Sequence, residues 1–267
     1  MIRLALPYWH VDAFADRPFA GNQAAIMPLD EWLPDDTLQA IAAENLFAET
    51  AFVVPDASGE ADWELRWFTP AIEVALCGHA TLASGHVLLS RDGGGSVRFR
   101  TRKSGVLEVR RSGEGYELAL PAIATRRGAP DGVAETLGAA PGEALSNDKG
   151  YGVFVYPDEA AIRALRPDFK ALSAFGDFMA ICTAPGEARD VLSRVFVPGA
   201  GIDEDSVTGS AHAVLAPYWA ERLGRDHFTA HQASTRGGDL VCRLDGNRVW
   251  LGGQCVTVVE GTFYLSG

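Results

Sequence analysis

The chain has few cysteines and no cysteine motif. Its 267 residues include only Cys77, Cys182, Cys242 and Cys255, and no two of them stand in CxxC spacing. This scatter excludes a disulfide framework and a zinc ribbon as the basis of the fold. We therefore expect four free thiols.

The sequence also lacks long apolar runs and the common cofactor motifs. No stretch approaches the ~18 consecutive apolar residues of a membrane span, and the first residues lack the apolar region of a signal peptide. No dinucleotide-binding or phosphate-loop pattern stands at a strand-to-helix junction, and no histidine is spaced like a familiar metal ligand. We expect a cytoplasmic protein with no cofactor, no metal and no membrane partner.

Basic side chains are in deficit. Subtracting 35 acidic from 23 basic residues gives a formal net charge of -12. Such a charge repels phosphate backbones, which excludes a nucleic-acid partner. One basic tract, residues 98–102, alternates arginine with other residues at period two and is typical of the solvated face of a strand.

An internal repeat is the most informative feature that is present. Residues 66–70, RWFTP, lead to GHATL at 78–82, and residues 194–198, RVFVP, lead to GSAHA at 209–213. Each pair is followed by an apolar, helix-like stretch and then by runs of alternating residues. Coincidence is the alternative, but the matched positions recur in the same order. Self-similarity of this kind indicates two equivalent halves.

The halves are each expected to be rich in strands, with one prominent helix. We place the boundaries at 1–119, rejoined by a final strand at 256–267, and at 120–255. Hairpin turns are expected at 112–115 and 245–247. Further helices are expected at 35–44 and 158–165.

Glu49 is the first candidate catalytic residue. It lies between a predicted helix and an apolar strand-like run, AFVV at 51–54. Apolar surroundings raise the pKa of a carboxylate and suit it to exchange protons near neutral pH. A surface glutamate at a strand edge is the alternative interpretation.

His79 and Gly78 open the first prominent helix, where backbone N–H groups and the helix dipole could bind a substrate carboxylate. Glycine at this position allows the ligand to approach the backbone closely. The alternative for His79 is a purely structural cap of the helix.

The matching segment of the second half, EDSVTGS at 204–210, offers a carboxylate, hydroxyls and another helix start. Asp205, Thr208, Gly209 and Ser210 are therefore candidates for substrate binding, although Asp205 or Ser206 would also suit an ordinary N-cap.

Two further candidates are weaker. Asn22 follows Gly21 in a probable tight turn, which turn chemistry alone would explain. Arg236 lies in a glycine-rich stretch that could bring its guanidinium toward an anion, or could simply open a strand.

Five ordered motifs make the chain resemble the phenazine-biosynthesis isomerase-like (PhzF-like) family, and the resemblance covers nearly the whole sequence. The motifs are VDAF with Gly21-Asn22, NL with ETAF at 49–52, FTP at 68–70, CGHAT at 77–81, and ED with TGSA at 208–211.

The resemblance implies an α+β fold of the diaminopimelate epimerase type. Each of two pseudo-symmetric domains would be a barrel-like, mostly antiparallel sheet around a central helix, with the active site in the cleft and usually a homodimer. Glu49 would shuttle the proton, while His79, Asp205 and Ser210 would orient the substrate and assist proton transfer. Gly78 would supply a backbone contact.

Two departures from related proteins bear on this expectation. Related epimerases use a pair of cysteines, and here Cys77 stands at the first position while Thr208 stands at the second, which disfavours a two-thiol racemase. Gln23 replaces a proline that is often found after Gly-Asn.

The function expected is thus a cofactor-independent isomerase that moves a proton on a small carboxylic acid. Two alternatives stay open: an amino-acid epimerase, and a binding protein of the same fold that has lost turnover.

Overall fold

The computed structural model describes residues 3–266, which divide into two compact units. Described residues up to Leu120 and from Gly252 onward form unit 1, and Pro121–Leu251 form unit 2. The two units are described one at a time.

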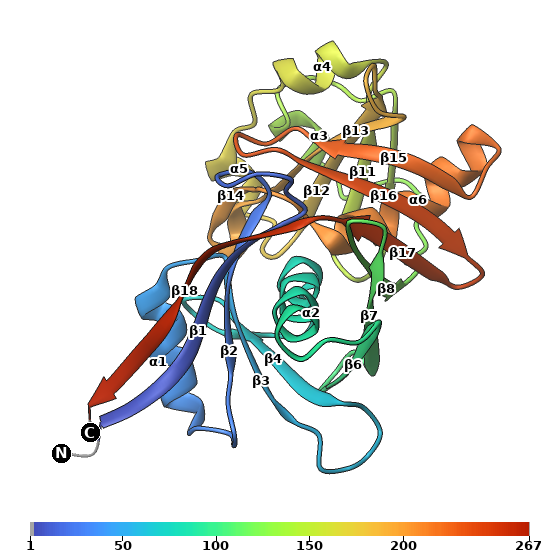
Figure 1. Ribbon diagram of the computed structural model, residues 1–267. Helices are drawn as coiled ribbons and strands as arrows, with labels where there is room; N and C mark the ends of the chain where they lie inside the picture. Colours follow the sequence, from blue (N-terminus) through green and yellow to red (C-terminus); the bar gives the residue numbers. More distant parts are fainter. Residues whose placement is uncertain (1–2, 267) are drawn as a thin grey trace. The chain divides into compact units, whose positions relative to one another are not determined.

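Unit 1 is a curved sheet with helix α2 packed against its inner face (Figure 1). The helices are α1 (Asp35–Asn45) and α2 (Gly78–Asp92). The strands are β1 (Arg3–Ala13), β2 (Asn22–Pro28), β3 (Glu49–Pro55), β4 (Trp63–Phe68), β5 (Glu73–Val74), β6 (Ser96–Thr101), β7 (Val106–Ser112), β8 (Gly115–Pro121) and β18 (Cys255–Ser266).

The pairing in unit 1 is mostly antiparallel. Strand β1 pairs with both β18 and β2, β3 pairs with β4, and β6, β7 and β8 follow as a meander. The parallel pairs are β2 with β3 and β4 with β6. Parallel neighbours need a long crossover, and α1 and α2 supply these two crossovers.

Helix α2 is the central helix that the sequence predicts for the first half. Eleven of its fifteen residues are buried, so its sequence is apolar or small almost all round. A Cβ on Gly85 would lie 2.3 Å from Cγ1 of Val109, so this glycine lets the helix approach β7 closely.

Helix α1 covers the other face of the sheet. Leu38, Ile41 and Ala42 share one side of the helix, as the 3.6-residue period predicts, and pack with Phe52 and Phe68. Asp35 and Asp36 occupy the first turn, where acidic groups interact favourably with the helix dipole.

Unit 2 repeats this plan. Its helices are α3 (Val133–Thr136), α4 (Glu159–Ala164), α5 (Phe169–Ser173), the 3-10 turn η1 (Pro198–Ala200) and α6 (Gly209–Leu223). Its strands are β9 (Arg126–Arg127), β10 (Glu143–Ser146), β11 (Tyr151–Val155), β12 (Met179–Pro185), β13 (Val191–Val197), β14 (Ile202–Asp205), β15 (His227–Gln232), β16 (Gly238–Asp245) and β17 (Arg248–Gly253).

The strand pairs correspond one to one between the units. In unit 1, β2 is parallel to β3, β3 antiparallel to β4, and β4 antiparallel to β5 and parallel to β6. In unit 2, β11 to β15 repeat the same senses in the same order. The fold is therefore α+β with two pseudo-symmetric domains, as expected.

A buried ion pair explains the repeated RxF motif. Arg66 binds Glu73 through two hydrogen bonds of 2.8 and 2.9 Å. Arg194 binds Glu204 at the same two distances. Each guanidinium carbon also lies 4.9 Å from the centre of a phenylalanine ring two residues later. Two-pronged pairing with a carboxylate selects arginine over lysine at both positions.

Proline inside α6 is accommodated by a contact outside the helix. Pro217 has no N–H to donate to the carbonyl oxygen of Ala213, four residues earlier. That oxygen instead accepts a hydrogen bond from the Ile123 backbone N–H at 3.1 Å. The start of unit 2 is thereby tied to its central helix.

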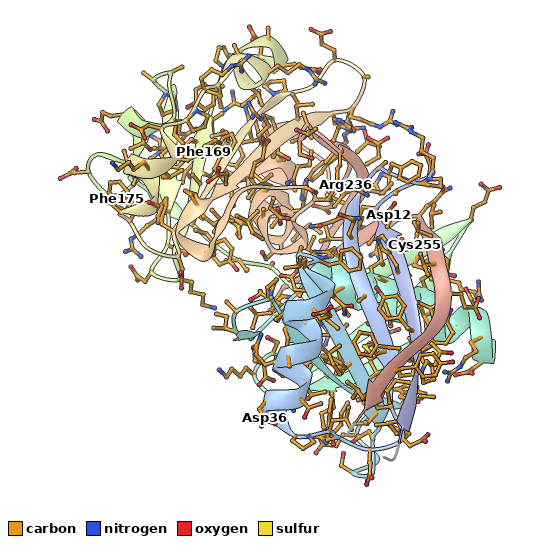
Figure 2. The ribbon with its side chains drawn as sticks, turned by 90° about the vertical axis from the view of Figure 1, so that its left-hand side faces the viewer. Asp12, Asp36, Phe169, Phe175, Arg236 and Cys255 are labelled. Atoms are coloured by element: carbon orange, nitrogen blue, oxygen red, sulfur yellow. The ribbon has the colours of Figure 1, made fainter. Side chains whose placement is uncertain are left out.

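The core of unit 2 lies between its sheet and the short helices. Phe154, Leu172 and Phe196 are at its centre, and Phe169 and Phe175 of the α5 region pack against it (Figure 2). All four cysteines are free, as expected, within the described part of the chain. None of the helices formed by residues 3–266 is long and apolar enough to cross a membrane.

Candidate active site

Glu49 is the first residue of β3 and follows the short turn that links α1 to this strand. Helix α1 ends at Leu46, which adopts the left-handed conformation with φ of 55°. The chain then enters β3, where Glu49 pairs with Ala24 of β2. The Glu49 side chain is only 15% exposed. The alternative of a surface glutamate is therefore wrong.

His79 lies beside this carboxylate. Its Nε2 atom is 3.0 Å from Oε2 of Glu49, and the imidazole is almost fully buried. Oε2 is buried and has no aligned hydrogen bond among the described residues, so this contact is an electrostatic one. His79 is not a helix cap, because the N-cap of α2 is Cys77.

Asn22 holds the opposite side of the imidazole ring. The amide nitrogen of Asn22 lies 3.1 Å from Nδ1 of His79. Toward a neutral ring the amide donates to Nδ1 and the ring proton is on Nε2, the atom that faces Glu49, whereas toward a protonated ring Asn22 accepts through its amide oxygen. Gly21 sets the position of Asn22, because its φ is +66° and a Cβ there would lie 2.1 Å from the carbonyl oxygen of Ala13.

Cys77 completes the cluster. Its Sγ atom lies 3.5 Å from Nδ1 of His79. Burial, together with the Glu49 carboxylate, raises the pKa of the Cys77 thiol to about 11, so it is a neutral thiol near pH 7. Burial opposes the charged form of His79, but the pKa of His79 is still raised well above its usual value, and near neutral pH the nearby charge that can raise it is the Glu49 carboxylate.

The beginning of α2 also carries backbone donors. Within residues 3–266, no side-chain hydrogen bond caps this end of the helix. The N–H groups of the first turn, from Gly78 onward, have no acceptor within the helix and lie at the positive end of its dipole. An anionic group is the natural ligand for such donors.

The second-half candidates lie together in unit 2, in the loop before α6. Oγ1 of Thr208 donates to Oδ2 of Asp205 at 2.6 Å. The N-cap of α6 is Thr208, so the N-cap alternative for Asp205 and Ser206 is wrong. Gly209 and Ser210 are the first two residues of α6.

Gln232 is a residue that sequence reasoning missed. It is fully buried and accepts from the Thr208 N–H at 2.9 Å. Its amide nitrogen donates to the Asp205 carbonyl at 2.8 Å and to the Thr208 hydroxyl at 3.1 Å. The only sequence signal was its place at the start of the stretch that contains Arg236.

Arg236 lies in the loop between β15 and β16, partly buried. This loop is fastened to the one before α6, because the Ser234 hydroxyl donates to the Ser206 carbonyl at 2.7 Å. The structure thus brings the Arg236 loop next to the Asp205 loop within unit 2. In unit 1 it brings Asn22, Glu49 and His79 together.

The comparisons with known proteins can be set against this geometry. A family model described as phenazine biosynthesis-like protein, PhzC-PhzF, matches residues 11–261. The chain belongs to this family.

Relatives span the full chain. A Pseudomonas aeruginosa protein named an uncharacterized isomerase is 47% identical over 265 residues, covering 98% of this chain and 100% of its own. A crystal structure of a PhzF family protein from Enterococcus faecalis is 41% identical, with a TM-score of 0.91, and covers 98% of this chain and 100% of its own.

The fold extends beyond the family. A hydroxyproline epimerase from Agrobacterium vitis, solved with bound trans-4-hydroxy-L-proline, matches with a TM-score of 0.60 at 11% identity, covering 98% of this chain and 93% of its own. At that identity the likeness concerns the fold alone. All nine candidate residues lie within the range that the PhzF family model matches.

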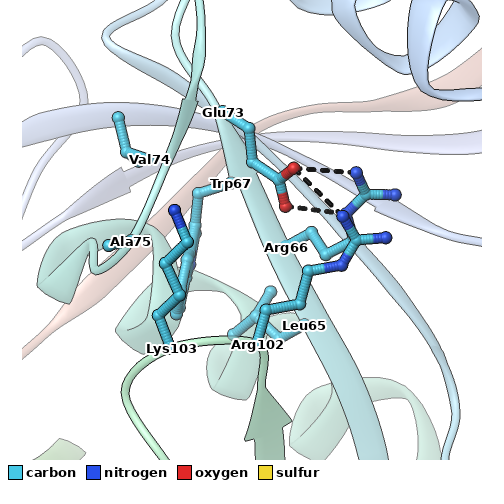
Figure 3. Close-up of a pocket in the computed structure, with 8 residues that line it drawn as sticks. All are labelled: Leu65, Arg66, Trp67, Glu73, Val74, Ala75, Arg102 and Lys103. Atoms are coloured by element: carbon cyan, nitrogen blue, oxygen red, sulfur yellow. Dashed lines mark hydrogen bonds and ion pairs between the residues drawn. The ribbon is translucent and has the colours of Figure 1, made fainter.

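A separate cavity of about 200 Å³ lies in unit 1 beside the edge of β4 (Figure 3). Strand β6 pairs with the beginning of β4, and β5 pairs with its end. It is lined by Leu65, Arg66, Trp67, Glu73, Val74, Ala75, Arg102 and Lys103. Arg102 contacts Glu73 at 3.3 Å. The arginines of the 98–102 tract alternate with the buried Phe99 and Thr101, as a solvated strand face predicts. None of the predicted site residues lines this cavity.

Proposed function

We propose that this PhzF family member is an isomerase that moves a proton on a small carboxylic acid, with Glu49 as the proton-transferring base. The observation that carries the proposal is the buried array of Asn22, His79 and Glu49. Buried, interacting titratable groups mark functional sites more often than structural ones.

Each residue of the array has a role in the proposal. Asn22 holds the His79 ring from its Nδ1 side, so that Nε2 faces the Glu49 carboxylate. The backbone N–H groups at the start of α2, including that of Gly78, bind the substrate carboxylate.

The proposed proton transfer is carried out by the Glu49 carboxylate. Glu49 accepts a proton from an acidified carbon of the substrate as that C–H bond breaks, and the electron pair delocalises into the adjoining unsaturated system. Glu49 then returns the proton to another carbon, so a new C–H bond forms and the carboxylate is regenerated. A positioned base of this kind contributes about 10²–10⁴-fold to the rate.

In unit 2, Asp205 is proposed as a second acid–base group, with Thr208, Gly209, Ser210 and Arg236 as binding groups. Gln232 positions Asp205 and Thr208 through its three hydrogen bonds. Kinetics of Asp205→Asn, alone and combined with Glu49→Gln, would test whether both acids serve one reaction, because residues that act together have non-additive effects.

Deuterium incorporation from D₂O tests the proposal directly. A panel of small unsaturated and amino carboxylic acids is followed by NMR with wild-type protein, Glu49→Gln and the matched control Glu44→Gln. Glu44 is exposed on α1, five residues before Glu49. We expect exchange with wild type and the control, and a loss of at least about 10²-fold in Glu49→Gln.

Other outcomes would replace the proposal. Undiminished exchange in Glu49→Gln would remove this residue as the base. Exchange at a stereocentre with inversion would favour an epimerase, although a thiol with a pKa of about 11 is a poor second base near neutral pH. Ligand-induced thermal stabilisation that survives Glu49→Gln, with no exchange in any compound, would favour a binding protein.

A further inference from the structure

The cluster in unit 1 combines three kinds of metal ligand. The ligand atoms of Glu49, Cys77 and His79 all lie within 4.8 Å of one another. Thiolate, imidazole and carboxylate are the groups that bind zinc in proteins, and sites with three protein ligands leave a fourth position open. The sequence did not reveal this set, because Glu49 is 28 residues before Cys77 and no familiar metal spacing joins them.

The three ligand atoms are near enough to one another to reach one cation after side-chain adjustment. Bonds of ~2.0–2.1 Å to nitrogen and oxygen and ~2.3 Å to sulfur, at tetrahedral angles, place neighbouring N and O ligands about 3.4 Å apart and N and S about 3.6 Å apart. Here Nε2 of His79 is 3.0 Å from Oε2 of Glu49 and 3.9 Å from Sγ of Cys77. The Sγ atom of Cys77 is nearer to Nδ1 of His79, at 3.5 Å, so coordination through Nε2 requires the Cys77 side chain to turn toward Glu49.

The surroundings also suit a cation. Cys77 and His79 are buried, and Oε2 of Glu49 is buried without an aligned hydrogen bond among the described residues. A metal-bound histidine generally donates its other N–H to a neighbouring oxygen, which fixes the ring. Asn22 already faces Nδ1 of His79, and rotation of its amide would place the oxygen there.

We propose that a thiophilic divalent cation, of which Zn²⁺ is the probe, binds to Sγ of Cys77, Nε2 of His79 and Oε2 of Glu49. The fourth position is left for water. Binding releases the thiol proton of Cys77 and the Nε2 proton of the charged His79 ring, which keeps its proton on Nδ1. A cation held there occupies the carboxylate oxygen that faces His79.

This cation acts as a reversible inhibitor. Glu49 cannot accept a substrate proton while its oxygen and its histidine partner are coordinated. The inhibition rests on the proposed function, whereas the binding of the cation does not. Zinc is therefore expected to stop deuterium exchange, and a chelator is expected to restore it.

Cobalt spectroscopy tests the binding without any reference to turnover. Metal-free protein titrated with Co²⁺ should take up one ion per chain, with a near-ultraviolet thiolate-to-cobalt charge-transfer band and the intense visible bands of four-coordinate cobalt. Cys77→Ser should lose the charge-transfer band. The matched control Cys255→Ser should keep it, because Cys255 lies on β18 outside the cluster.

Zinc affinity gives the quantitative test. Competition with a chromogenic chelator should show affinity lowered by at least about 100-fold in Cys77→Ser and His79→Asn, more than the ~10–100-fold loss typical of outer partners. Cys255→Ser and Glu44→Gln should bind zinc like wild type. Thermal melting checks that each variant is folded, and Cys77→Ala provides a second replacement.

The outcomes separate the two proposals. Absence of the charge-transfer band in wild type, or unchanged zinc affinity in folded Cys77→Ser and Cys77→Ala, would overturn the metal site and leave the isomerase proposal intact. Cobalt binding through Cys77 in a protein that exchanges no substrate proton even when metal-free would leave the metal site and remove the function. Full exchange with zinc bound would overturn the inhibition.

Discussion

Helices α2 and α6 begin alike but carry different chemistry. In both, the side chain of the fourth residue bonds back to the N-cap carbonyl: the Thr81 hydroxyl donates to Cys77 at 2.5 Å, and Nδ1 of His212 donates to Thr208 at 2.8 Å. A glycine is the first residue of each. The shared geometry is thus a backbone feature that different side chains can maintain.

The difference lies in the charges beside each helix. The start of α2 carries a histidine whose pKa is raised, and the mostly buried carboxylate of Glu49 on β3 lies beside it. Beside α6, burial lowers the pKa of His212 to about 4, and neutral groups of Gln232 and Thr208 form most of the hydrogen bonds. The equivalent helix starts of two duplicated units can therefore hold different sets of charged and neutral groups.

Replacing each of the two histidines in turn should give the largest effect on the rate of deuterium exchange. His79→Asn removes the partner of Glu49, and the rate of deuterium exchange should fall by about 10²-fold or more. His212→Asn keeps a donor for the Thr208 carbonyl, and its exchange rate should stay close to wild type. Equal losses in both variants would contradict the division of roles, which NMR exchange kinetics would show.

Removing the three hydrogen bonds of Gln232 should cause the largest loss of stability. Gln232→Ala deletes three hydrogen bonds and leaves the Thr208 N–H buried without its acceptor. A destabilisation of about 3 kcal/mol is expected, since each unsatisfied buried group costs about 1–3 kcal/mol. Urea denaturation measures this, and hydrogen exchange at β15 and α6 locates it. An unchanged midpoint of urea denaturation would mean that these hydrogen bonds do not stabilise the protein.

Acid should weaken unit 2 through His212. The pKa of this residue is about 4 in the folded chain against 6.5 as its usual value, so between these pH values the unfolded chain binds the extra proton. Stability therefore falls as the pH drops from 6.5 to 4, by about 3 kcal/mol in total from this group. His212→Asn should lack this component. Denaturation is measured for both proteins across this pH range. The same dependence of stability on pH in both would contradict the prediction.

The smallest effect on stability is expected at the arginine–carboxylate pair that each unit contains. Arg66→Lys and Arg194→Lys each replace a two-pronged bond to a carboxylate with a single point of contact. Losses of about 1–2 kcal/mol are expected for each, and they should be similar because the distances match. Thermal denaturation of both variants measures this. A loss confined to one variant would show that the repeat is not energetically equivalent.

Local patterns in the sequence were enough to predict several helices and hairpins. The apolar spacing of Leu38 and Ile41 predicted α1, and the polar interruptions at 112–115 and 245–247 predicted hairpins that the structure confirms. The repeated arginine and glycine motifs predicted two equivalent units. These signals are readable because helix period, turn chemistry and duplication are properties of neighbouring residues.

Contacts between distant residues depended on the folded chain. Asn22 and His79 are 57 residues apart, and Thr208 and Gln232 are 24 apart, yet each pair is hydrogen-bonded. The pKa directions of His79 and His212 also follow from burial and from the neighbours that folding brings in. A histidine in a sequence has no environment until the sheet closes around it, so only the tertiary structure gave His79 a raised pKa and His212 a lowered one.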